Sequence, residues 1–120
     1  YKVTGVQTCA LPICCRPGLQ SDGAVSPGRR ISSVASARAM QELLRAVVQR
    51  GTGTAASLGG QEGGKTGTTN GGRDLLFIGY DPSRHWVMGI WLGNDDNSPT
   101  HGSSALAADL WGEIIRSTHP

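Results

Sequence analysis

Two stretches of the chain carry apolar residues at the three- and four-residue spacing of a helix face. Because residues three and four apart lie on one side of an α-helix, each stretch predicts an amphipathic helix. Ser33 and Gly51 bound the first helix with residue types that favour helix starts and ends. The apolar positions are Ala37, Met40, Leu43, Leu44, Val47 and Val48 within residues 33–50, and Ala107, Leu110, Trp111, Ile114 and Ile115 within residues 103–117.

Three shorter stretches, residues 63–69, 75–80 and 86–92, are rich in threonine, aromatic and aliphatic residues and predict strands. The turn-forming residues between them favour antiparallel hairpins. The last stretch is apolar on both faces, so we expect it to be a central strand covered on both sides. The fold class that follows is α/β of the α+β type, a partial antiparallel sheet of about three strands flanked by two helices.

The glycine-rich stretch between the first helix and the sheet, residues 51–62, predicts a loop with a short strand near residues 54–57. The polar residues 93–102 predict a loop that caps itself. Its Asp95-Asp96 pair lacks the alternating oxygen ligands of a calcium loop, so we expect no metal site and no cofactor.

Composition narrows the possible functions. A chain of 120 residues allows one domain or a piece of one. Its formal charge of only +2 does not suggest binding to nucleic acid or to an anionic membrane surface. No apolar run approaches the length of a membrane-spanning helix, and no targeting signal is visible. Because the chain begins with Tyr1 rather than Met, we expect a fragment.

The N-terminal stretch Val3–Ile13 (VTGVQTCALPI) resembles the translation of a widely used sequencing-library adapter. The alternative is an ordinary N-terminal strand, since Val3, Val6 and Ile13 favour strands. The unbroken match favours the artefact, so the cysteines at 9, 14 and 15 carry no redox information. Residues 1–30 are therefore expected to be an adapter-derived and disordered segment, and residues 31–117 the folded part.

The chemistry of the chain concentrates in Gly63–Thr69 (GGKTGTT), which holds one lysine, three hydroxyls and three glycines. The residues Gly59–Thr66 also satisfy the phosphate-loop pattern G-x-x-x-x-G-K-[ST]. A phosphate loop needs a buried strand before its first glycine and a helix beginning near the lysine. Neither is predicted here, which argues against a phosphate loop. Because the motif matches, nucleotide binding is kept as the alternative hypothesis.

The context of the lysine supports a different family. Lys65-Thr66-Gly67 is a triplet found in penicillin-binding proteins and serine β-lactamases. Around it lie VVQRGTGTAA upstream, and then GKTGTTN, Arg73-Asp74, FIGY, WLGNDDN and a Gly-Ser-Ser loop before the helix with Trp111. From about Ile31 to Ser117 this order resembles the C-terminal end of the transpeptidase domain of bifunctional penicillin-binding proteins, within the serine β-lactamase and D,D-transpeptidase fold.

The resemblance implies a role for each residue of the motif. Lys65 would supply positive potential and orient the active-site hydroxyls. The hydroxyls of Thr66 and Thr68 would bind the substrate carboxylate, and Gly67 would let substrate approach the strand. The Thr68 backbone N–H would be one of two oxyanion-hole donors. The partners implied are D-Ala-D-Ala stem peptides of peptidoglycan and β-lactams.

The chain departs from the family's pattern in one respect, since none of its serines begins S-x-x-K or S-x-N. Without a nucleophilic serine no acyl-enzyme forms, so we expect the chain to be inert alone. The parent protein is expected at the bacterial cell membrane, held by an anchor outside these residues, with this domain on the extracytoplasmic side.

Overall fold

A computed structural model describes residues 6–7 and 32–118. Their elements are the strand β1 (Val6–Gln7), the helix α1 (Val34–Arg50), the 3-10 turn η1 (Thr54–Ala56), the strand β2 (Gly63–Thr68), the turn η2 (Asn70–Gly72), the strands β3 (Asp74–Asp81) and β4 (Trp86–Gly93), and the helix α2 (Ser104–Ser117). The two helices and three long strands predicted from the sequence are confirmed.

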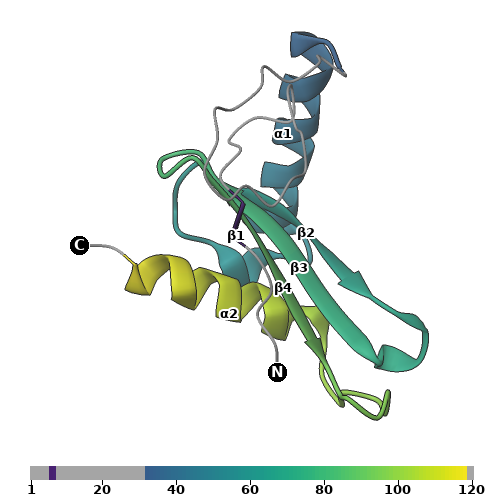
Figure 1. The fold of residues 1–120 in the computed structure, drawn as a ribbon. Coiled ribbons are helices and arrows are strands. Elements are labelled where there is room, and N and C mark those ends of the chain that lie inside the picture. The colour runs from purple at the N-terminus through teal and green to yellow at the C-terminus, as the bar shows by residue number, and fades with distance from the viewer. Residues whose placement is uncertain (1–5, 8–31, 119–120) are drawn as a thin grey trace, which may run out of the picture.

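The strands form one antiparallel sheet in the order β1-β4-β3-β2 (Figure 1). The register pairs Thr66 with Phe77 and Phe77 with Ile90, so these three residues lie side by side across the long strands. The central long strand is therefore β3. The strand β4 lies between β3 and the two-residue β1, so residues 86–92 form an inner strand as expected. Only alternate residues of β4 are buried, and the other face is partly exposed, so the expected cover on both sides is incomplete.

The strand β1 lies within Val3–Ile13, the stretch that we expect to be adapter-derived. It pairs with β4 through Val6 opposite Met88 and Gln7 opposite Val87. An edge strand offers unpaired backbone groups to any extended segment that reaches it, which accounts for such a short pairing. The remainder of the stretch, residues 3–5 and 8–13, lies outside the described residues.

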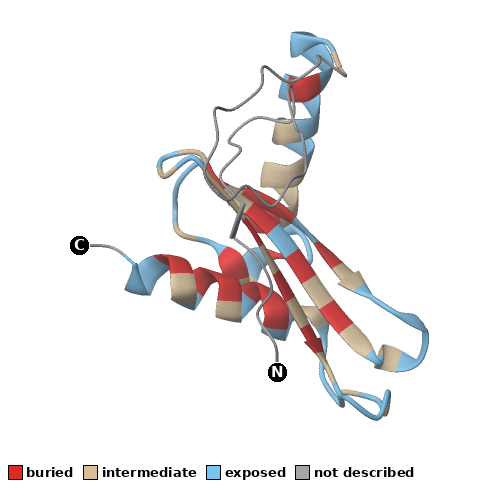
Figure 2. Ribbon diagram, viewed as in Figure 1, coloured by how far each residue is buried: buried red, intermediate tan, exposed pale blue. Residues whose placement is uncertain are grey.

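The core lies between one face of the sheet and the helix α2. Alternate residues of β3 and β4 are buried, and the side of α2 that faces the sheet is buried as well (Figure 2). The rings of Phe77 and Trp111 meet edge to face, with centroids 5.6 Å apart. Gly79 makes this contact possible, because a Cβ there would lie 2.8 Å from the Trp111 ring. The side chains that complete the core are Val48, Leu75, Met88, Ile90, Leu92 and Ile115.

The helix α1 packs on the sheet near its C-terminal end and projects beyond it at the other end (Figure 1). Ser33 caps it as predicted, with its hydroxyl accepting the Ser36 N–H at 3.0 Å. Of the predicted apolar stripe only Ala37 and Val48 are buried, and Leu43 is 64% exposed. The stripe is thus present, but in the described structure the sheet covers only part of it.

The link between α1 and β2 differs from the prediction. Residues 54–56 form the 3-10 turn η1, so the expected short strand near residues 54–57 is wrong. Ala56 is fully buried beneath α2, and small side chains allow that close contact with the helix. Neither α1 nor α2 has the length and apolar character needed to cross a membrane.

Asp81, at the turn between β3 and β4, has hydrogen-bond partners that change its pKa. Burial by itself raises the pKa of Asp81, but hydrogen bonds from the Ser83 hydroxyl at 2.6 Å and backbone N–H at 2.9 Å, with the Arg84 ion pair, outweigh it. The pKa of Asp81 therefore lies below its ordinary value of 3.8. A carboxylate with a depressed folded-state pKa stabilises the fold above its unfolded pKa, and this stability is lost as pH falls through the folded value.

We therefore expect Ser83→Ala to lower the free energy of unfolding at pH 7 and to matter less at pH 3. Urea denaturation at both pH values measures the difference. Ser103→Ala is the matched control, because the Ser103 side chain makes no cap hydrogen bond to α2. Any change in the free energy of unfolding of this variant should be the same at both pH values. An equal loss of stability for Ser83→Ala at both pH values would show that the Asp81 carboxylate is not the group involved.

Candidate functional site

The predicted site lies on β2, the strand at one edge of the sheet. Every residue of β2 from Gly63 to Thr68 has a partner on β3, and the sheet order places no described strand on its other side. An edge strand leaves alternate backbone N–H and C=O groups without sheet partners. The site therefore has one fixed edge and one edge open to another group.

The hydrogen bond that closes the β2–β3 hairpin shows which backbone groups of β2 point away from β3. The Thr69 N–H donates to the Asp74 carbonyl oxygen at 3.1 Å, toward β3. Because successive residues of an antiparallel strand turn their backbone groups to opposite sides, the groups of Thr68 and Thr66 point away from β3. The Thr68 backbone N–H thus faces the open edge, where it is free of the sheet's hydrogen-bond ladder.

Lys65 brings a positive charge to the same edge. Its side chain is exposed, and its Nζ donates to the Thr66 carbonyl oxygen at 2.8 Å. This carbonyl is one of the groups that point away from β3, so the bond holds the ammonium group along the outer edge of β2. Within residues 32–118, the Lys65 ammonium group forms no ion pair.

The two threonines of the motif share the face opposite to the Lys65 side chain, since side chains alternate along a strand. Thr66 is buried, and its hydroxyl lies 2.6 Å from the hydroxyl of Thr52. Thr68 is exposed. Thr52 is a site residue that the sequence did not single out, because a contact across a 14-residue separation leaves no periodic signal.

The two glycines Gly64 and Gly67 differ in how much space the surrounding chain leaves for a side chain. A Cβ at Gly64 would lie 2.4 Å from the Phe77 ring and 2.7 Å from the Ile78 carbonyl oxygen, so packing within the chain requires glycine there. A Cβ at Gly67 would come no closer than 3.5 Å to any atom of its surroundings, which is ordinary contact. The described part of the chain therefore leaves room for a side chain at Gly67.

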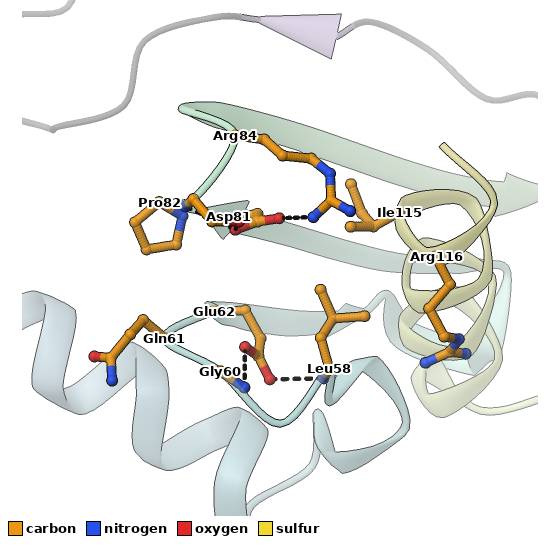
Figure 3. Close-up of a pocket in the computed structure, with 10 residues that line it drawn as sticks. Leu58, Gly60, Gln61, Glu62, Asp81, Pro82, Arg84, Ile115 and Arg116 are labelled. Atoms are coloured by element: carbon orange, nitrogen blue, oxygen red, sulfur yellow. Dashed lines mark hydrogen bonds and ion pairs between the residues drawn. The ribbon is translucent and has the colours of Figure 1, made fainter. Parts of the chain in front are cut away.

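The phosphate-loop hypothesis for Gly59–Thr66 is wrong. Its lysine lies on the strand β2 rather than at the start of a helix. The loop before it already holds an anion of its own, because the Glu62 carboxylate accepts the N–H groups of Leu58 at 2.7 Å and Gly60 at 2.9 Å (Figure 3). The backbone donors that would cradle a phosphate are thus occupied by a buried side chain.

A cavity of about 560 Å³ lies at the opposite end of the sheet from Thr68. Figure 3 shows it between the loop around Glu62, the turn around Asp81 and the end of α2 at Arg116. Glu62 bonds its own loop, and Asp81 bonds Ser83 and Arg84. The cavity contains none of the motif residues, so it does not form part of the predicted site.

The loop after β4 caps itself as predicted. The Asn94 side chain donates to the Ser98 and Pro99 carbonyl oxygens, and Asp96 accepts the Ser98 N–H. Hydrogen bonding to Ser98 lowers the pKa of Asp96. Residues 32–118 contain no cluster of three or more potential metal ligands.

The arrangement on β2 can stabilise negative charge. Within four consecutive residues, an outward backbone N–H and an ammonium group lie along the open edge, and two threonine side chains share one face of the strand, with that of Thr66 buried against Thr52. Fixed donors of this kind stabilise a developing oxyanion without reorganising.

Comparison with known proteins shows the family of the chain. Residues 16–116 match the family model for the penicillin-binding protein transpeptidase domain. The chain is 40% identical over 75 residues to penicillin-binding protein 1A of Clostridium botulinum strain Langeland, covering 61% of this chain and 9% of that protein. It is 47% identical over 64 residues to penicillin-binding protein 1B of Vibrio cholerae, covering 51% of this chain and 8% of that protein. The chain thus spans about a tenth of the length of these relatives.

Two solved structures are similar to the fold. The D,D-transpeptidase domain of a peptidoglycan glycosyltransferase from Eggerthella lenta aligns with a TM-score of 0.59 and 28% identity, over 80% of this chain and 23% of that one. A peptidoglycan glycosyltransferase structure from Atopobium parvulum aligns with a TM-score of 0.65 and 23% identity, over 80% of this chain and 25% of that one. Because the family model covers most of the chain and the fold agrees, the chain belongs to the penicillin-binding protein transpeptidase domain family.

Proposed function

We propose that β2 forms one wall of the active site of a peptidoglycan D,D-transpeptidase, which cross-links stem peptides through a serine acyl-enzyme. The observation that carries this proposal is the open edge of β2, where the Thr68 N–H points outward beside the Lys65 ammonium group. Family membership supports it, because acyl transfer by a serine enzyme requires such a donor opposite the nucleophile.

The Thr68 N–H is proposed as one of two donors of an oxyanion hole. When a serine oxygen attacks the carbonyl of D-Ala-D-Ala, the carbonyl oxygen becomes negatively charged and needs hydrogen-bond donors that are already in place. The second donor would be the backbone N–H of the serine itself. Losing one such donor typically slows acyl transfer by about 10²- to 10³-fold.

The other motif residues are proposed to bind the substrate. The hydroxyls of Thr66 and Thr68 lie on one face and would contact the terminal carboxylate, with Thr52 orienting the Thr66 hydroxyl. The Lys65 ammonium group would attract this carboxylate and orient the hydroxyl groups of the active site. Gly67 would lie against the substrate backbone, which explains a glycine at a position where the described chain has room for a side chain.

The nucleophile is proposed to lie in a part of the transpeptidase domain that these 120 residues do not contain, so the chain alone should not form an acyl-enzyme. The apolar side chains that remain exposed support this view. Met40 and Leu43 on α1 are 49% and 64% exposed, and Ile78 on β3 is 56% exposed. The rest of such a domain would cover these surfaces.

The partners and location follow from the same proposal. The longer protein would act on D-Ala-D-Ala stem peptides, be acylated by β-lactams, and work on the extracytoplasmic side of the bacterial cell membrane. We expect no role for nucleic acid or for a cofactor.

We also propose that the stretch Val3–Ile13 derives from a sequencing adapter and that the domain begins after it. The family match supports this boundary, because it begins at Arg16. Sequencing the original DNA across residues 3–15 tests the proposal. A coding sequence that continues upstream without adapter bases through this stretch would contradict it.

The proposed function predicts the effect of removing the cation at the open edge. In the longer protein recovered upstream of Arg16, Lys65→Ala should slow acylation by a fluorescent penicillin by about 10²-fold, because the ammonium group stabilises the charge that develops at the site. The rate of labelling on a gel measures the effect.

Arg50→Ala is the control for the loss of a positive charge, because Arg50 lies at the exposed end of α1. It should be labelled at the normal rate. Normal labelling of a folded Lys65→Ala variant would remove Lys65 from the site, and a longer protein without S-x-x-K would remove the transpeptidase proposal altogether.

The proposed function also predicts different effects for substitutions at the two glycines. Gly67→Ala should unfold at nearly the same urea concentration as the unsubstituted protein, because the added Cβ would lie at ordinary contact distance from Leu76. It should lose penicillin labelling, because the same Cβ would crowd the bound ligand. Gly64→Ala should instead destabilise the fold by about 1–3 kcal/mol, because its Cβ would overlap the Phe77 ring. Full labelling of Gly67→Ala would contradict the proposed contact between substrate and strand.

A further inference from the structure

The proposed oxyanion donor, the Thr68 N–H, belongs to a residue that the sheet does not hold directly. Thr68 lies opposite Leu75, in a pair whose backbone groups point away from each other. Its orientation must therefore come from the residues on either side of it. On one side Gly67 pairs with Leu76 within the strand. On the other side the strand ends, and Thr69 must be fixed by other means.

Thr69 is held by Asp74 through both backbone and side chain. The Thr69 N–H donates to the Asp74 carbonyl oxygen at 3.1 Å, and the Asp74 N–H donates to the Thr69 hydroxyl oxygen at 2.9 Å. The same hydroxyl donates to the Asp74 carboxylate at 2.9 Å. Three hydrogen bonds thus join the residue after Thr68 to the first residue of β3.

The carboxylate of Asp74 is itself fixed by the next strand. Its other oxygen accepts the Trp91 indole N–H at 3.0 Å, from β4. Gly93 leaves room for this bond, because a Cβ there would lie 2.6 Å from the Trp91 ring and 3.1 Å from the Asp74 carboxylate. A chain of side-chain hydrogen bonds therefore runs from β4 through β3 to the end of β2.

We propose that Asp74 is a positioning residue for acyl transfer, which keeps the Thr68 N–H in place by anchoring Thr69 at the end of β2. The bonds to Thr69 keep the end of β2 paired with β3. If this end came away from β3, Thr68 would move with it, and its N–H, which belongs to the peptide unit between residues 67 and 68, would leave its place opposite the oxyanion. Charge-assisted bonds to a carboxylate are stronger than neutral ones, and two strands hold this carboxylate in place.

The inference rests on the proposed function of the Thr68 N–H, and it also makes a claim about the chain alone. In the 120-residue chain, Thr69→Val and Asp74→Ala should accelerate hydrogen exchange at the Thr69 amide and shift the Thr68 amide resonance in the NMR spectrum. Thr69→Ser keeps the hydroxyl and should restore both signals. If neither Thr69→Val nor Asp74→Ala alters these two amides, the positioning role is excluded.

The functional measurement uses the longer protein recovered upstream of Arg16. Thr69→Val and Asp74→Ala should each lower the penicillin acylation rate constant roughly tenfold and leave the affinity of the first, noncovalent complex nearly unchanged, because a misplaced donor acts on the transition state. Thr69→Ser should acylate at the normal rate. A purely structural role would lower the melting temperature without this separation of rate from affinity.

The outcomes distinguish the two proposals. If the unsubstituted longer protein is not acylated, the proposed function fails whatever Asp74 does. If the unsubstituted protein is acylated and both variants react at the normal rate, the proposed function stands and the positioning role of Asp74 is overturned.

Discussion

The one-sided pairing of β2 is the constraint on which the rest of the structure depends. The strand is hydrogen-bonded to β3 along one edge, and its other edge has no partner among the described strands. Antiparallel geometry then turns the Thr66 and Thr68 backbone groups outward. A central strand with the same side chains would have no free donors. The capacity to stabilise an anion therefore comes from the position of the strand in the sheet as much as from Lys65.

The packing of the chain keeps this edge straight and in register. The absence of a side chain at Gly64 lets β2 lie against Phe77, and Phe77 in turn contacts Trp111 on α2. At the start of β2 the buried Glu62 binds the backbone of the preceding loop, and at its end Asp74 binds Thr69. Both ends of the strand are thus fixed by carboxylates while its outer edge stays open.

Much of this architecture could be predicted from the sequence, because it depends on local pattern. Periodic apolar residues locate both helices, and the glycine and proline turns separate the three strands. The failures involve long-range effects. The strand β4 is an inner strand as its composition predicts, but only one of its faces is buried, because that depends on how α2 packs on the sheet. The contacts of Thr52 with Thr66 and of Trp91 with Asp74 cross the fold, so the two residues that support the site leave no signal near the motif.

The match of Gly59–Thr66 to a phosphate loop shows that a motif predicts function only when the secondary structure around it fits. The same residues form a loop closed by Glu62 and then a strand. A motif's chemistry depends on the element that carries it, since a phosphate loop requires backbone N–H groups at a helix start. In this chain the lysine extends from an edge strand, where it contacts a carbonyl oxygen of its own strand.

The most direct test of the account is the structure of the longer protein acylated by a β-lactam. The account predicts that the acyl carbonyl oxygen lies about 2.7–3.1 Å from the Thr68 backbone nitrogen. It also predicts that the carboxylate of the β-lactam lies beside the Thr66 and Thr68 hydroxyls. An acyl-enzyme whose carbonyl oxygen points away from β2, or whose serine faces another part of the sheet, would contradict it.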